Sequence, residues 1–231
     1  MNINDIITEL NKEKTNNYKE FSSKLIPSSK PILGVRVPIL RTIAKKIVKD
    51  DPISFLENNN FSYYELEMLQ AMVIGYMKTD ILTKIYYADK FIPIINNWSV
   101  CDTFCQTFKE TLIYPSEVMK LLKKYISSKK EFELRVVVVM FLSHYLNDEF
   151  VDEVIKIVDT IKHDGYYYKM GAAWLIATIM AKYPAKCFEY LENNNLDDFV
   201  INKSIQKMNE SFRVSIENKQ KALKYKRKKE L

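Results

Sequence analysis

The chain has 231 residues, of which 47% are hydrophobic and 28% are charged, and only four are glycines. This composition is typical of a folded globular protein and excludes a largely disordered chain. The net charge of +6 comes from residues 219–231, which hold seven of the 35 basic residues and one of the 29 acidic residues. Residues 1–218 therefore carry no net charge. Their affinity for nucleic acid depends on whether their basic residues gather on one face.

No segment of the chain has the pattern of a targeting or membrane-spanning sequence. The first five residues lack the basic and apolar regions of a secretory signal. The longest apolar runs, residues 136–142 and 170–181, are shorter than the roughly 18 residues that a membrane span needs. We therefore expect a cytoplasmic protein.

The cysteines and histidines do not form the pattern of a metal site. Cys101, Cys105 and Cys187 are an odd number, and neither His144 nor His163 stands at a ligand spacing from them. A zinc site and a disulfide framework are both disfavoured, and reduced thiols in the core are expected instead. The sequence predicts no metal and no cofactor.

Apolar residues recur at intervals of three and four along almost the whole chain, which predicts helices throughout. The predicted helices span residues 4–12, 15–25, 38–49, 52–58, 62–78, 80–90, 97–112, 115–127, 131–146, 148–163, 166–183, 184–192, 197–210 and 214–228. The longest loop is predicted at residues 26–38, where three prolines and a glycine interrupt the pattern. The four valines at 136–139 favour a strand by propensity, but the continuing pattern after them favours a buried helix.

Basic residues line one side of the predicted helix 38–49. Arg41 and Lys45 are four residues apart, and Arg36 precedes them in the loop. Such a stripe is a candidate for contacts with DNA phosphates, and a solvated helix face is the alternative.

Two helix starts repeat the same pair of residues, Tyr114-Pro115 and Tyr183-Pro184, and the two prolines are 69 positions apart. This spacing accommodates two helical hairpins of about 35 residues each. We therefore predict an all-α fold, an α-solenoid of HEAT-like antiparallel helical hairpins that forms a curved, right-handed superhelix. Residues 1–218 are expected to be a single solenoid domain. Residues 219–231 are expected to be a basic tail, either the end of the last helix or disordered.

The stretch 97–105, with the sequence NWSVCDTFC, contains the candidate catalytic residue. Trp98 and Asp102 are four residues apart, which places an indole and a carboxylate on one face of a helix. A carboxylate beside a large aromatic surface suits a cationic ligand. The alternative is that Trp98 belongs to the core and Asp102 interacts with the helix dipole.

Five segments of the chain together resemble the DNA alkylation repair family of bacterial HEAT-like glycosylases, the AlkD-like proteins. These segments are residues 18–41, 97–102, 134–136, 168–175 and 202–213. The resemblance implies roles for particular residues. Asp102 matches the family's catalytic aspartate, Trp98 and Trp174 match its active-site tryptophans, and Arg135 matches its DNA-contacting arginine. Phe21 falls close to a position where family members often have a tyrosine, and Tyr18 lies one turn earlier.

The resemblance implies a DNA glycosylase that hydrolyses the N-glycosidic bond of positively charged N3- and N7-alkylated purines. Its partner is double-stranded DNA with alkylated bases, and we expect a monomer that associates with the bacterial nucleoid when it binds DNA. A cationic base leaves without a general acid, so one carboxylate suffices where other glycosidases use two. Two alternatives remain open: a non-catalytic binder of damaged or branched DNA, and a HEAT-like scaffold for a protein partner.

Overall fold

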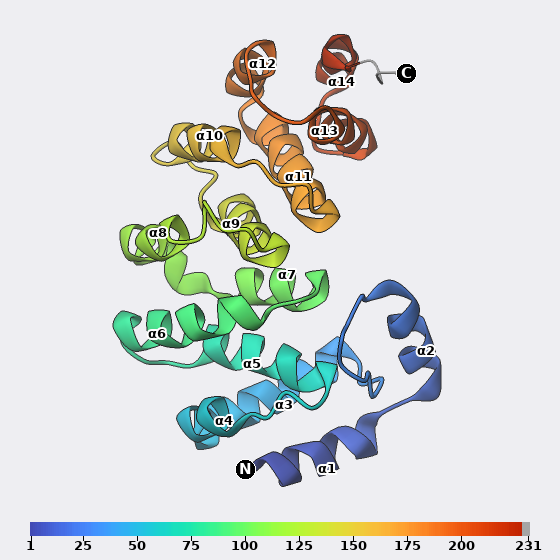
Figure 1. Ribbon diagram of the computed structural model, residues 1–231, viewed down its shortest axis with the longest axis vertical. Coiled ribbons are helices and arrows are strands. Elements are labelled where there is room, and N and C mark those ends of the chain that lie inside the picture. Colours follow the sequence, from blue (N-terminus) through green and yellow to red (C-terminus); the bar gives the residue numbers. More distant parts are fainter. Residues whose placement is uncertain (228–231) are drawn as a thin grey trace. The chain divides into compact units, whose positions relative to one another are not determined.

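The computed structural model describes residues 1–227, and these residues form helices and loops without any strand (Figure 1). This confirms the all-α prediction. The α-helices of the described residues are α1 (Ile3–Glu13), α2 (Asn16–Leu25), α3 (Val37–Asp50), α4 (Pro52–Asn58), α5 (Tyr64–Tyr76), α6 (Ile81–Phe91), α7 (Trp98–Thr107), α8 (Pro115–Lys123), α9 (Glu131–His144), α10 (Val151–Thr160), α11 (Tyr166–Lys182), α12 (Pro184–Glu192), α13 (Asp198–Glu210) and α14 (Ile216–Ala222). Three short 3₁₀ helices are η1 (Ile92–Ile94), η2 (Lys109–Leu112) and η3 (Leu223–Tyr225).

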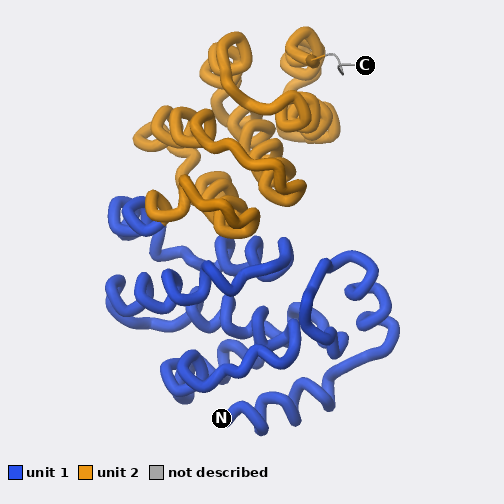
Figure 2. The backbone as a smooth tube through the Cα atoms, viewed as in Figure 1, with its two compact units in different colours: residues 1–121 blue, residues 122–231 orange. Residues whose placement is uncertain are grey.

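The chain divides into two compact units, Met1–Leu121 and Leu122–Leu231 (Figure 2). Unit 1 contains α1 to α7 and unit 2 contains α9 to α14, while α8 crosses the boundary. The expectation of one domain over residues 1–218 stays a prediction.

In each unit one helix is packed between two others. In unit 1, α5 contacts α3 and α7, and in unit 2, α11 contacts α9 and α13. Helices that follow one another in the sequence also contact each other: α3 contacts α4, α5 contacts α6, and α11 contacts α12. Stacked hairpins of this kind are the building units of an α-solenoid, in agreement with the predicted fold. The curvature and the right hand of a superhelix stay predictions.

The valine run at residues 136–139 lies within α9, and all four side chains are fully buried. Burial on every side of α9 outweighs the strand propensity of valine, because tertiary packing supplies more stabilisation than local preference. Gly171 on α11 allows close approach, since an added Cβ would lie 2.9 Å from Cγ2 of Val138. The prediction of a buried helix here is confirmed.

The prediction of one helix over residues 97–112 is wrong. Helix α7 ends at Thr107, and η2 follows after Phe108, which leaves the helical conformation with ψ of 64°. The hydroxyl of Thr107 donates to the carbonyls of Thr103 and Phe104, at 2.9 and 3.1 Å. Such local side-chain bonds compete with helix continuation, and the fully buried Phe108 gains more from the core than from another helical turn.

The loop between α2 and α3 is held by a buried carboxylate of α5. Glu65 is fully buried, and its oxygens accept the backbone N–H groups of Leu33, Gly34 and Val35 at 3.0, 2.8 and 3.3 Å. Gly34 has a φ of +98°, which only glycine adopts readily. Its carbonyl accepts the N–H of Thr15, just before α2, at 3.0 Å. The loop therefore fixes the start of α2 to α5.

The three cysteines lie buried in the core, as expected for reduced thiols, and burial raises the pKa of Cys187 to about 12. Within residues 1–227, no three histidine, cysteine, aspartate or glutamate side chains gather into a group able to hold a metal ion. In the same part of the chain no helix is long and apolar enough to span a bilayer.

The first part of the expected basic tail has a defined structure in unit 2. Residues 219–222 belong to α14, and η3 follows directly. Arg227 donates through its guanidinium to the carbonyl of Leu196 and to Asp198, at 2.6 and 2.7 Å. The expectation for residues 228–231 lies outside the described residues.

Candidate functional site

The start of α7 is set by a buried asparagine. Asn97 is fully buried, and its side-chain oxygen accepts the N–H of Val100 at 3.0 Å, which caps the helix. Its amide nitrogen donates to the Glu67 carboxylate on α5 at 3.4 Å. These bonds fix where α7 begins, and therefore where its first residue, Trp98, is placed.

Trp98 is held at both its backbone and its ring. It is half-buried, and its indole N–H donates to the backbone carbonyl of Leu25, the last residue of α2, at 3.1 Å. Asp102 lies one turn later on α7 and is also partly exposed. The predicted arrangement of an indole and a carboxylate one turn apart on a helix is confirmed. The indole is anchored by its edge through the N–H.

A tyrosine and a serine support this part of α7. The hydroxyl of Tyr64 lies 2.7 Å from Oγ of Ser99, the residue that follows Trp98. Burial strongly raises the pKa of Tyr64, against the opposing effect of the bond to Ser99, so this phenol stays neutral and can donate. Sequence reasoning missed this pair because the two residues are 35 positions apart and nothing in either local pattern links them.

A second carboxyl group lies directly beneath the α7 start. Glu67 is buried, and burial raises its pKa to about 7. A hydrogen bond from Asn96, at 3.3 Å, and the charge of Lys30 oppose the shift. Glu67 therefore changes charge near neutral pH while it is bonded to the residue that caps α7.

The aromatic residues of α2 gather with one of the predicted cations. The rings of Tyr18 and Phe21 are stacked with centroids 6.1 Å apart, and the Arg36 guanidinium lies 5.9 Å from the Tyr18 centroid. Phe21 is 59% exposed, which is unusual for a side chain of this size. The structure thus brings Tyr18, Phe21 and Arg36 together in unit 1.

The remaining predicted cations of unit 1 are exposed on α3. Arg41 and Lys45 point to solvent, while Leu40, Ile43 and Ala44 of the same helix are buried. Both side chains are therefore accessible from solvent.

In unit 2, Arg135 is a buried and anchored side chain. It is 6% exposed, and its Nη1 donates to the carbonyl of Tyr167 near the start of α11 at 2.6 Å. The side chain passes over Gly171, where an added Cβ would come within 3.6 Å of Nη1. Arg135 is therefore almost wholly enclosed, and its bond to the Tyr167 carbonyl ties the guanidinium to α11.

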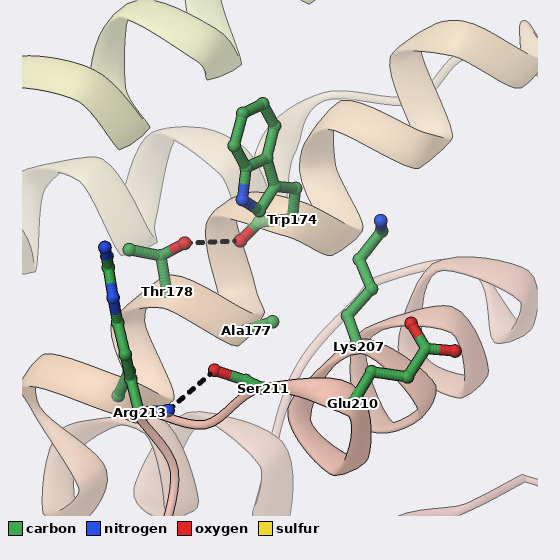
Figure 3. A pocket seen from close by; sticks show the side chains of 8 residues that line it. Trp174, Ala177, Thr178, Lys207, Glu210, Ser211 and Arg213 are labelled. Atoms are coloured by element: carbon green, nitrogen blue, oxygen red, sulfur yellow. Dashed lines mark hydrogen bonds between the residues drawn. The ribbon is translucent and has the colours of Figure 1, made fainter.

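Trp174 lies on α11 at a pocket of about 360 Å³ (Figure 3). Trp174 is 37% exposed, so it is not a core residue. Lys207 on α13 and Arg213 just after it also line the pocket. Both cations fall within the segment 202–213 that carries part of the family resemblance, but the sequence analysis assigned a role to neither.

The comparisons with known proteins agree with the resemblance in the sequence. No curated protein matches the chain. Residues 6–208, most of the chain, match a family described as DNA alkylation repair enzyme. The matched range includes Trp98, Asp102, Arg135 and Trp174. The chain belongs to the DNA alkylation repair enzyme family.

Proposed function

We propose that the protein is a DNA glycosylase that removes N3- and N7-alkylated purines from duplex DNA. One observation carries this proposal: in a member of an alkylation repair family, α7 presents an anchored indole, Trp98, and a partly exposed aspartate, Asp102, one turn apart. We propose that it acts on chromosomal DNA in the cytoplasm.

The chemistry needs one carboxylate. An alkylated purine carries a positive charge and is already a good leaving group, so no side chain has to protonate it. As the bond between C1′ and the base nitrogen breaks, positive charge develops on the sugar. We assign Asp102 to stabilise this charge and to position the attacking water, because a fixed negative charge at the reacting carbon acts most strongly in the transition state.

Trp98 suits the binding of a cationic nucleoside. Its N–H is engaged by the Leu25 carbonyl, which holds the ring in one orientation before any ligand arrives. A cation against an indole face contributes about 0.5–2 kcal/mol. This contribution favours charged lesions over neutral bases. Trp174 offers a second partly exposed indole in unit 2.

The cations supply contacts with the DNA backbone. Arg36, Arg41 and Lys45 are exposed in unit 1 and are assigned to phosphates. Arg135 is also assigned to a phosphate. Its bond to the Tyr167 carbonyl fixes the orientation of the group and lowers the conformational entropy lost when DNA binds.

The direct test is release of 7-methylguanine or 3-methyladenine from methylated duplex DNA. We expect release by the wild type and a loss of at least about 100-fold in Asp102→Asn, as for removal of a group that stabilises transition-state charge. Asp164→Asn is the matched control, because Asp164 is fully exposed and its carboxylate forms an ion pair with Lys169. Equal release by wild type and Asp102→Asn would refute the catalytic role. DNA binding without any release would identify a non-catalytic binder instead.

A further inference from the structure

The pocket between α11 and α13 has the features of a binding site for a phosphate group. We propose that it holds a phosphodiester of a DNA strand, with Lys207 and Arg213 binding the phosphate and Trp174 packing against the adjoining sugar. The proposal rests on DNA being the partner, as in the proposed function, and adds a subsite in unit 2 with its own residues.

Positive charge dominates the lining of the pocket. Lys207 and Arg213 line it, and Glu210 is its one acidic residue. The Glu210 carboxylate accepts a hydrogen bond from Gln206 at 2.8 Å. Across residues 1–227, neither Lys207 nor Arg213 forms an ion pair with any acidic side chain. The two cations are therefore available to an anion that enters from solvent.

Lys207 is placed where an anion would stabilise it. The side chain is half-buried, and burial lowers its pKa. The charge of Glu210 opposes this shift, and the positive charges of Lys203 and Arg135 add to it. A partly desolvated ammonium beside other cations has unfavourable electrostatics, which a bound phosphate would relieve.

The shape of the pocket fits a sugar-phosphate unit. Figure 3 shows Lys207 and Arg213 on opposite sides of Ala177 and Ser211, with both charged ends extended toward the side where the Trp174 ring lies. Small side chains between the cations leave room for a phosphate, and a partly exposed indole offers a flat surface to a sugar or base.

Two hydroxyl groups of the pocket hold this arrangement. The Thr178 hydroxyl donates to the Trp174 carbonyl at 2.8 Å. The Ser211 hydroxyl accepts the N–H of Arg213 at 3.2 Å, which fixes the backbone from which the Arg213 side chain extends. The Ser211 hydroxyl keeps its own O–H as a donor, so it can add a hydrogen bond to a phosphate that the two cations bind.

The test measures how DNA affinity depends on salt in the full-length protein. Each phosphate contact contributes a slope of about 0.9 to the plot of log affinity against log salt for duplex DNA. We expect Lys207→Gln and Arg213→Gln each to lower the slope by about that amount, and Lys207→Arg to retain it. Lys156→Gln on α10 is the charge-matched control and should leave the slope unchanged, because Lys156 lies on the surface away from this pocket.

A fluorescence titration supplies a local readout. The chain has two tryptophans, so Trp98→Phe leaves Trp174 as the only one. Duplex DNA should change its emission, and Lys207→Gln together with Arg213→Gln should weaken that titration. A response to inorganic phosphate at millimolar concentration without a response to DNA would overturn the assignment to a DNA strand.

The outcomes separate the subsite from the catalytic proposal. Unchanged slopes in Lys207→Gln and Arg213→Gln, or an equal decrease in Lys156→Gln, would overturn the subsite even if base release is normal. Lowered slopes in the two pocket variants would support the subsite even if no base is released, in which case only the glycosylase proposal fails.

Discussion

The indole N–H of Trp98 donates a hydrogen bond to the backbone carbonyl of Leu25, 73 residues earlier in the chain and 3.1 Å away. This bond joins the last residue of α2 to the first residue of α7. The side chain proposed to bind a cationic nucleoside therefore also holds α2 in place. Because Phe21 lies one turn before Leu25, the exposed aromatic face of α2 depends on the same bond.

Replacement of Trp98 by phenylalanine should loosen α2. The variant keeps an aromatic ring but leaves the Leu25 carbonyl without its donor, at a cost of about 1 kcal/mol. Amide hydrogen exchange in residues 16–25 should become faster. Trp174→Phe is the matched control, because the Trp174 indole N–H has no hydrogen-bond partner in residues 1–227. Equal exchange in α2 for both variants would show that the bond does not hold this helix.

The helical pattern of the sequence was sufficient to predict the class of fold. Core residues such as Leu40, Ile43 and Ile47 recur at helical spacing, and burial of these positions follows from that spacing alone. The break after Thr107 was not predictable, because it depends on the burial of Phe108 and on hydroxyl bonds that are visible only in three dimensions. Local pattern predicts which residues face the core, and tertiary contacts decide where a helix ends.

Glu65→Gln should destabilise the loop before α3. The carboxylate accepts three backbone N–H groups, and the amide offers one oxygen and places an NH₂ group against the remaining donors. We expect a loss of about 1–3 kcal/mol in the free energy of unfolding, as for buried donors left unsatisfied. Chemical denaturation measures it. Glu57→Gln, at a solvent-exposed position, should change stability by much less; a similar loss there would contradict the role of Glu65.

The buried ion pair between α6 and η2 should show strong coupling. Lys84 is fully buried, and its Nζ lies 2.5 Å from Oε1 of Glu110 and 3.1 Å from the carbonyl of Gly75. Lys84→Met leaves the partly buried Glu110 without a counter-ion and should cost about 3 kcal/mol. Adding Glu110→Gln should recover most of that loss, because it removes the uncompensated charge.

A double-mutant cycle by urea denaturation measures this coupling. Additive losses in the double variant would show that the two charges do not stabilise each other.

The candidate site was predictable only where its residues belong to one short segment or to a family pattern. Trp98 and Asp102 could be paired because both lie on α7 within five residues. Tyr64 and Glu67, which support α7 from α5, could not, because helical periodicity does not predict which distant helix lies beneath a given turn. Lys207 and Arg213 could not be assigned to the site either, because the fold alone brings them to one pocket with Trp174.

Glu67 should make the stability of the protein fall as the pH rises toward neutrality. Burial raises the pKa of its carboxyl group from 4.5 to about 7 in the folded chain. Between these values the folded state binds more protons at this site than the unfolded state, so stability decreases with increasing pH. This loss of stability is absent below about pH 4.5 and complete above about pH 7. Its full size is on the order of 2 kcal/mol, allowing for partial solvent screening.

Glu67→Gln removes the titrating group and keeps an oxygen that can accept from Asn96 or Asn97. Its free energy of unfolding should match the wild type near pH 4.5 and exceed it by a growing margin up to about pH 7, with a plateau above. Denaturation curves at several pH values measure this difference. Glu20→Gln, at an exposed position on α2, should show no such trend. If the free energies of unfolding of Glu67→Gln and the wild type differ by a constant amount from pH 4.5 to 8, the charge on Glu67 is not coupled to folding. In that case the cap of α7 is also insensitive to the protonation of Glu67.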